Sequence, residues 1–237
     1  MAEYGRSNLE VNFKLKIKVF EMIESEKIYS PLNKTALFMI QRRLRVMRDI
    51  FSYNFPYGVE NIKLFEIGCG NGQWFAEFAT LGFNFANFAG IEIDPIRVTK
   101  AKDRIPFADI QHGDASKLPW DDDSFDVVFQ STVFTSIKDE SKQNEIASEM
   151  KRVCKKTGGF VLWYDFIYDN PSNPDVKGIS KLQIKKLFEP WNCEFRSVTL
   201  APPIARRVVP ISWSLAEDLE TFFPFLRTHL ISVIKPV

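Results

Sequence analysis

The sequence has few of the residues that mark a metal-binding or disulfide-bonded protein. It contains three cysteines and two histidines in 237 residues, and Cys69, Cys154 and Cys193 lack metal-ligand spacing. An odd number of scattered cysteines fits a reducing compartment better than a disulfide framework. We therefore predict no metal site and expect a cytoplasmic protein.

Excess charge and long apolar runs are scarce as well. Lys and Arg number 31 against 30 Asp and Glu, so no global field would attract nucleic acid or an anionic membrane. Residues 1–9 are polar, unlike a signal peptide, and no run approaches the length of a membrane span. The sequence thus predicts no membrane span and no nucleic-acid partner, and it does not indicate an oligomeric state.

Phenylalanine, in contrast, is abundant, with 22 residues in a chain of ordinary globular composition. We expect most of these rings to pack in a core, and the length suits one large α/β domain.

The N-terminal part of the chain has helical periodicity. Apolar residues recur three or four positions apart around residues 13–23 and again around residues 37–50. We expect residues 1–58 to form a helical cap ahead of a main domain at residues 59–237. The basic run at residues 41–48 is expected to be a solvated helix face.

After Pro56, short apolar runs alternate with helical stretches, a pattern typical of a mostly parallel sheet covered by helices. Strands are expected at residues 63–67, 88–92, 109–112, 125–130, 159–166, 195–200 and 229–235. Helices are expected at residues 72–81, 95–103, 140–155 and 180–188, and residues 206–225 are predicted to be irregular or helical. The pattern predicts an α/β fold with seven strands.

The first of these strands runs directly into three alternating glycines, Gly68, Gly70 and Gly72, and a helix follows at once. Glycine lacks a Cβ and accepts unusual dihedral angles, so such a turn brings a ligand against bare backbone at a helix N-terminus. A dinucleotide-binding fingerprint requires its last glycine at position 73, where this chain has Gln73. The spacing therefore disfavours a pyrophosphate ligand.

Together with the preceding acidic residue Glu66, these glycines resemble the first motif of the class I S-adenosylmethionine-dependent methyltransferases, and of their type 11 members in particular. The resemblance extends over residues 64–162. It implies a Rossmann-like fold and S-adenosylmethionine as the cofactor.

Two further acidic residues agree with this resemblance. Glu92 ends the second expected strand, where a carboxylate can accept hydrogen bonds from ribose hydroxyls. Asp114 follows the third strand, and the resemblance implies that it contacts the adenine amine. The predicted cofactor site comprises Glu66, Gly68, Cys69, Gly70, Gly72, Glu92, Ile93, Asp114, Ala115, Gln130 and Ser131.

The catalytic residues are harder to identify. Many relatives have a histidine shortly after the fourth strand, whereas this chain has Thr135 and Ser136. If the acceptor is a hydroxyl, a base is needed, and Asp165 at the end of the fifth strand is the first candidate, followed by Tyr164 and Asp169. A structural role for Asp165 stays open, and His229 is expected to be structural.

Acceptor specificity is expected from the cap and from insertions near residues 167–190 and 201–225. The loop carrying Asp169 and Asn170, and the pair Arg206 and Arg207, resemble segments of methyltransferases from bacterial polysaccharide pathways. We expect the loop to bind a polar acceptor and an arginine to meet a phosphate.

The predicted function is S-adenosylmethionine-dependent O-methylation of a small polar or sugar-containing acceptor, either a small molecule or a glycan. A nicotinamide-dependent oxidoreductase and a cofactor-binding protein without catalysis are the alternatives.

Overall fold

The fold is a seven-stranded sheet with helices on both faces, given by a computed structural model that describes residues 30–169, 173 and 175–237. The strands are β1 (Leu64–Ile67), β2 (Phe88–Glu92), β3 (Asp109–His112), β4 (Val127–Ser131), β5 (Phe160–Phe166), β6 (Asn192–Leu200) and β7 (Arg227–Lys235). The helices are α2 (Lys34–Asn54), α3 (Gln73–Ala79), α4 (Pro95–Arg104), α5 (Glu140–Val153), α6 (Lys181–Phe188), α7 (Pro202–Val208) and α8 (Trp213–Phe222). The 3-10 turns are η1 (Phe85–Asn87), η2 (Phe134–Ser136) and η3 (Pro224–Leu226).

The strand order is β3-β2-β1-β4-β5-β7-β6. The pairs from β3 to β5 are parallel, whereas β7 runs antiparallel to both β5 and β6. This mostly parallel, Rossmann-like sheet confirms the predicted fold class. The order reverses beside β1, so the carboxyl ends of β1 and β4 border the crevice where open α/β sheets bind ligands.

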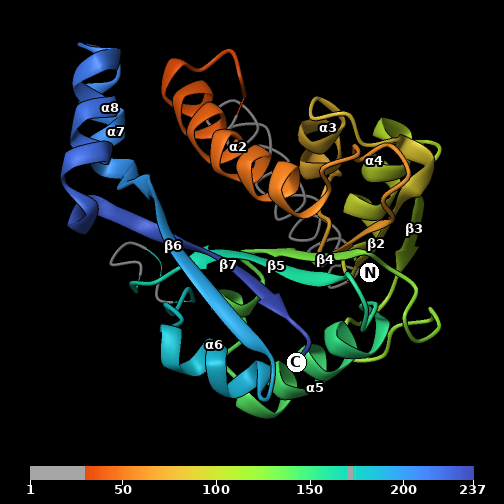
Figure 1. Ribbon diagram of the computed structural model, residues 1–237. Coiled ribbons are helices and arrows are strands. Elements are labelled where there is room, and N and C mark those ends of the chain that lie inside the picture. The colour runs from red at the N-terminus through yellow and green to blue at the C-terminus, as the bar shows by residue number, and fades with distance from the viewer. Residues whose placement is uncertain (1–29, 170–172, 174) are drawn as a thin grey trace, which may run out of the picture.

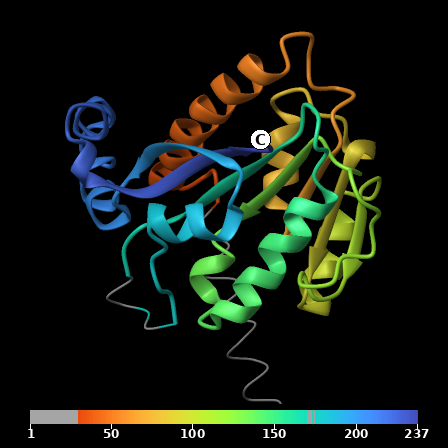
Figure 2. The ribbon, with the colours of Figure 1, turned by 60° about the horizontal axis from the view of Figure 1, so that its bottom comes forward.

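Helices cover the sheet as two layers (Figures 1 and 2). Helices α2, α3 and α4 lie on one face, and α5 and α6 lie on the other. The central strands are buried on both faces because each layer forms its own apolar core, and Phe78 and Phe129 meet in one while Phe134 and Trp163 meet in the other. Of the 20 phenylalanines in the described residues, 12 are buried, so most of them pack in the core as expected.

Helix starts follow local capping chemistry. Asn33 caps α2 through its side chain, Asp94 caps α4 immediately before Pro95, and Ser180 forms a capping box with Gln183 at the start of α6. The segment expected to be irregular or helical, residues 206–225, contains α8 and the end of α7, which begins earlier, at Pro202. These two helices project from one end of the molecule beside β6 (Figure 1).

Helix α2 is the part of the predicted N-terminal cap that the structure describes. Its Met47, Ile50 and Phe51 are buried in the core of the main domain, and Phe51 makes an edge-to-face contact with Phe78 at 5.6 Å between ring centroids. The first predicted helix, near residues 13–23, lies outside the described residues, and the division of the chain at residue 58 stays a prediction. Among the described helices, none combines the length and apolar character needed to cross a membrane.

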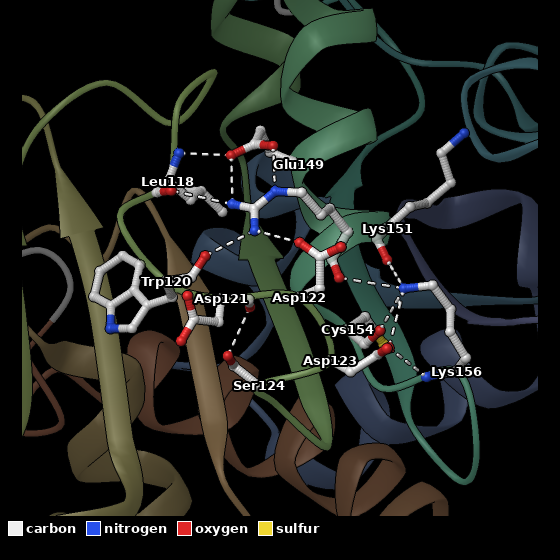
Figure 3. A network of polar contacts seen from close by, with 11 residues as sticks. Leu118, Trp120, Asp121, Asp122, Asp123, Ser124, Glu149, Lys151, Cys154 and Lys156 are labelled. Atoms are coloured by element: carbon white, nitrogen blue, oxygen red, sulfur yellow. Dashed lines mark hydrogen bonds and ion pairs between the residues drawn. The ribbon is translucent and has the colours of Figure 1, made fainter.

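Arg152 ties the end of α5 to the loop between β3 and β4 (Figure 3). Its guanidinium donates to both carboxylate oxygens of Glu149, to Asp122, and to the carbonyl oxygens of Leu118 and Trp120, at distances of 2.7–3.0 Å. Glu149 also accepts from the Leu118 N–H. One side chain therefore fixes the loop that carries the chain from the third to the fourth strand.

We expect Arg152→Ala to lower the free energy of unfolding by about 2–3 kcal/mol, because it removes several charge-assisted hydrogen bonds and leaves Glu149 unpaired. Urea unfolding measures this change. Arg48→Ala is the matched control, since Arg48 is exposed and pairs only with the adjacent Asp49 among the described residues, and its loss should cost about 0.5 kcal/mol or less. Equal effects of the two substitutions would contradict the assignment.

Candidate active site

The glycine loop after β1 has the backbone conformation that its sequence predicts. Gly68, Gly70 and Gly72 have φ angles of +63°, +54° and +72°, and Gly72 is the left-handed N-cap of α3. A Cβ on Gly68 would lie 2.7 Å from Val133 Cγ2, so that glycine is required by packing. Among the described residues, a Cβ on Gly70 would meet nothing within 4 Å, so these residues leave space above the Gly70 backbone.

Glu92 joins this loop to the end of β2. Its carboxylate is buried and accepts hydrogen bonds from the Gly70 N–H at 2.9 Å and the Asp94 N–H at 3.0 Å. Each carboxylate oxygen retains a further lone pair for a ligand hydroxyl. The loop and the carboxylate are therefore held together before any ligand binds.

Asp114 lies beyond β3, where it pairs with Lys142 of α5. Its carboxylate accepts from Lys142 Nζ at 2.6 Å and from both the N–H and the hydroxyl of Ser116. The hydrogen bond from Lys142 is the main reason that the pKa of Asp114 is lowered. The carboxylate is thus held ionised, ready to accept from an amine.

A cavity of about 410 Å³ opens over the glycine loop. It is lined by Ser30, Pro31, Glu66, Gly68, Cys69, Gly70, Asn71, Gln73, Trp74, Arg104, Ser131 and Thr132. Glu66 Oε2 and Asn71 Oδ1 are buried there without a hydrogen-bond partner among the described residues. Burial, reinforced by Glu77 and Glu92, raises the pKa of Glu66. These two oxygens, which can accept hydrogen bonds beside the glycine loop, fit the ammonium group of S-adenosylmethionine.

Only some of the other predicted cofactor residues line this cavity. Cys69 and Ser131 do, whereas Glu92 and Asp114 do not, and Gln130 is buried and accepts a hydrogen bond from the Val133 N–H. Ile93 is 69% exposed next to Glu92, and Ala115 packs near the second core. Asn71 was missed by the sequence reasoning, although it lies between two of the predicted glycines.

A second cavity of about 430 Å³ adjoins the first and shares Gln73, Trp74, Ser131 and Thr132 with it. Its remaining lining residues are Ala36, Met39, Ile40, Arg43, Glu77, Arg97, Tyr164, Phe166, Thr199, Pro202, Arg206 and His229. We call it the acceptor cavity. Helix α2 forms one wall, and residues of α3, α4 and α7, of strands β4 to β7 and of the loop after β4 form the rest.

Arg43 contradicts the expectation that residues 41–48 form a solvated helix face. Its guanidinium lies over the Trp74 ring, 4.2 Å from the centroid, and pairs with the carboxylate of Glu77. Its neighbour Arg42 pairs with Glu220 of α8 at 2.9 Å. The sequence shows that this run is basic. It could not show that α3 and α8, which pack beside the run, each present a buried glutamate to it.

Two aromatic residues in the acceptor cavity are buried titratable groups. Tyr164 stacks on His229 at 4.9 Å between ring centroids, and its hydroxyl shares a hydrogen bond with Thr199 Oγ1. Burial raises the pKa of Tyr164, while burial and then Arg43 lower the pKa of His229 to about 3. His229 is therefore neutral at physiological pH. It was expected to be structural, yet it lines the cavity.

Asp165 faces the opposite side of the sheet from Tyr164, because alternate residues of a strand point to opposite faces. It lines neither cavity, and its carboxylate accepts from the hydroxyl and N–H of Thr135 and from the Phe166 N–H. The prediction that Asp165 is a base acting on the acceptor is therefore not retained. The contacts of Asp165 with Thr135 instead fix the turn after β4. Tyr164, in contrast, lines the acceptor cavity.

Asp165 gives a pH-dependent prediction for stability. Burial raises its pKa from 3.8 to about 6, so the folded protein binds this proton more tightly than the unfolded chain does. Its contribution to stability is therefore lost as pH rises from about 4 to 6. Over that window, the wild type should lose on the order of 2–3 kcal/mol more than Asp165→Asn, as measured by urea unfolding at each pH. Parallel pH profiles of the two proteins would contradict this.

The predicted acceptor-binding residues are only partly brought together. Arg206 lines the acceptor cavity, but Arg207 does not. Asp169 is also away from it, with its carboxylate accepting from the Gly178 N–H. Asn170 lies outside the described residues.

Comparison with known proteins agrees with this geometry. The family model described as a methyltransferase domain, of type 11, matches residues 65–162. A phthiotriol/phenolphthiotriol dimycocerosates methyltransferase of Mycobacterium tuberculosis is 37% identical over 68 residues, which are 28% of this chain and 25% of that relative. A demethylmenaquinone methyltransferase of Staphylococcus aureus is 28% identical over 71% of this chain and 66% of its own length. The chain thus matches about a quarter of the first relative and about two thirds of the second.

Among solved structures, a geranyl diphosphate C-methyltransferase of Streptomyces coelicolor has the same fold, with a TM-score of 0.60 and 10% identity over 81% of this chain and 77% of that one. That protein was solved with S-adenosyl-L-homocysteine bound. The family match and the methyltransferase fold indicate S-adenosylmethionine as the cofactor of this site. Residues 65–162 therefore match the type 11 methyltransferase domain family.

Proposed function

We propose that this protein is an S-adenosylmethionine-dependent methyltransferase that acts on a small molecule bound in the acceptor cavity. The observation that carries this proposal is the junction of the two cavities. Gln73, Trp74, Ser131 and Thr132 line both, so a cofactor over the glycine loop would meet an acceptor at these residues.

The proposal assigns a contact to each part of the cofactor. In it, the oxygens of Glu66 and Asn71, which lack partners among the described residues, accept from the ammonium group, Glu92 accepts from the ribose hydroxyls, and Asp114 accepts from the adenine amine. The bound cofactor would supply an electrophilic methyl group on a sulfonium. These assignments make the protein's task one of binding and alignment.

Alignment alone is a strong catalytic factor. Holding two reactants in line can contribute about 7–11 kcal/mol to lowering a barrier. The four shared residues come from the start of α3 and from the end of β4, so two packed elements fix where the reactants meet.

The acceptor predicted from sequence is a small polar or sugar-containing molecule methylated on oxygen. Arg206 at the cavity supports an anionic group such as a phosphate. The rings of Trp74, Tyr164 and Phe166 add a surface for a planar or apolar body. We therefore propose O-methylation of an acceptor that combines a ring or apolar body with an anionic group.

Calorimetric titration tests the cofactor assignment. S-adenosylhomocysteine should bind with micromolar affinity and NAD should give no heat, whereas binding of NAD alone would favour a nicotinamide-dependent oxidoreductase. Transfer of a radiolabelled methyl group to a size-fractionated cell extract tests catalysis. Label in the small-molecule fraction is expected, and tight cofactor binding without any transfer would favour a binding protein without catalysis.

A further inference from the structure

Arg43 places a fixed positive charge in the wall of the acceptor cavity. Its side chain is only 17% exposed and is held by stacking on Trp74 at 4.2 Å and by pairing with Glu77. Trp74 also lines the cofactor cavity. The guanidinium is therefore anchored next to the junction where the two reactants would meet.

The guanidinium of Arg43 has more N–H donors than Glu77 uses. Glu77 engages Nε and one terminal nitrogen, which leaves further N–H donors of the five that arginine carries. Arg43 lowers the pKa of both Tyr164 and His229, and its influence on Tyr164 exceeds the opposing influence of Glu77. At Tyr164, the positive charge of Arg43 therefore outweighs the negative charge of its partner Glu77.

The same wall offers no good proton acceptor. Among the described residues that line the cavity, His229 has a pKa of about 3, burial raises the pKa of Tyr164, and the Glu77 carboxylate is occupied by Arg43. General base catalysis is most effective when the base has a pKa near the working pH. The described cavity residues therefore offer no effective general base for an acceptor that must lose a proton during methyl transfer.

We propose that the acceptor is bound and reacts as an ionised oxygen, a carboxylate or an acidic ring hydroxyl, which Arg43 holds in its deprotonated form above Trp74. This inference rests on the proposed function and names its substrate class. The other charged or titratable groups around the position are Glu77, Arg97, Tyr164, Arg206 and His229. Two of them are further arginines, which also favour an anion.

The probe for this proposal is 4-nitrophenol, whose ionised form is followed by its absorbance. In protein saturated with S-adenosylhomocysteine, the pKa of bound 4-nitrophenol should be at least one unit lower than the pKa of 4-nitrophenol free in solution. This shift means that the ionised form binds at least tenfold more tightly than the neutral form. Benzoate should displace it and benzamide should not. Comparing displacement of 4-nitrophenol by benzoate and by other acidic phenols shows whether a carboxylate or a ring hydroxyl binds better.

Three variants make the test specific. The double variant Arg43→Gln with Glu77→Gln removes both charges without leaving a buried unpaired carboxylate, and it should return the bound pKa to the free value. Arg43→Lys should retain at least half of the shift. Arg48→Gln, an exposed position on the same helix, should leave the shift unchanged.

Three outcomes would overturn the proposal: no binding of the phenolate, an unshifted pKa in the wild type, or an equal shift in the double variant. The titration with S-adenosylhomocysteine alone is read separately. Its failure would count against the proposed function, whereas normal cofactor binding without phenolate binding would count only against the role of Arg43.

Discussion

Replacing Gly70 with valine is expected to weaken S-adenosylhomocysteine binding by at least about 100-fold, measured by calorimetric titration. A Cβ at this position meets none of the described atoms within 4 Å, so the valine side chain would occupy the space over the loop in which we propose that the ligand binds. The φ angle of +54° also strains a β-branched residue by about 1–2 kcal/mol. The protein should still fold, because this strain is small compared with a typical free energy of unfolding.

Gly158→Val separates the loss of ligand space from backbone strain. Gly158 has a φ angle of +76°, is exposed in the turn before β5, and likewise has nothing within 4 Å of an added Cβ. Both substitutions should therefore lower the free energy of unfolding to a similar extent, but only Gly70→Val should impair ligand binding. Retained affinity in Gly70→Val would remove the cofactor assignment.

Glu92→Ala should also weaken S-adenosylhomocysteine binding by about 100-fold. It removes the carboxylate that we propose binds the ribose, and it releases the Gly70 N–H that this carboxylate holds at 2.9 Å. A 100-fold loss corresponds to about 2.7 kcal/mol, and hydrogen bonds to a charged group contribute about 1.5–3 kcal/mol each, so the loss of one or two accounts for this magnitude. Glu92→Gln keeps the shape and should have a smaller effect.

The control for Glu92 is a change in the ligand. An analogue without the ribose 2′- and 3′-hydroxyls should bind weakly to the wild type and lose little further affinity in Glu92→Gln. Equal losses for the two ligands would show that Glu92 acts only through the loop.

The cofactor half of the site could be predicted because its signals are local. Gly68, Gly70 and Gly72 lie within a few residues of β1, and Glu92 ends a strand whose apolar run is unambiguous. In a parallel sheet, carboxyl ends of neighbouring strands meet at one edge, so positions in sequence translate directly into positions in space. The Lys142 partner of Asp114 was not predicted, since it comes from a helix 28 residues away.

The acceptor half could not be predicted in the same way. Arg43, Tyr164 and His229 come from three distant elements, and β7 runs antiparallel to β5, so the face toward which His229 points depends on strand register. Asp165 is different, because two-residue periodicity already required Tyr164 and Asp165 to face opposite sides of the sheet. The sequence could have shown that only one of them borders any given cavity.

The adjacent arginines of α2 also constrain how the acceptor cavity can work. Arg43 ties the helix to Glu77 of α3, and Arg42 ties it to Glu220 of α8, whose carboxylate also accepts from the Thr199 N–H. Widening the cavity by moving either neighbouring helix would break a mostly buried ion pair. A cavity held by ion pairs on both sides should select its ligand by shape instead of adapting to it, so the proposed methyltransferase is expected to accept a narrow set of compounds and to reject bulkier analogues.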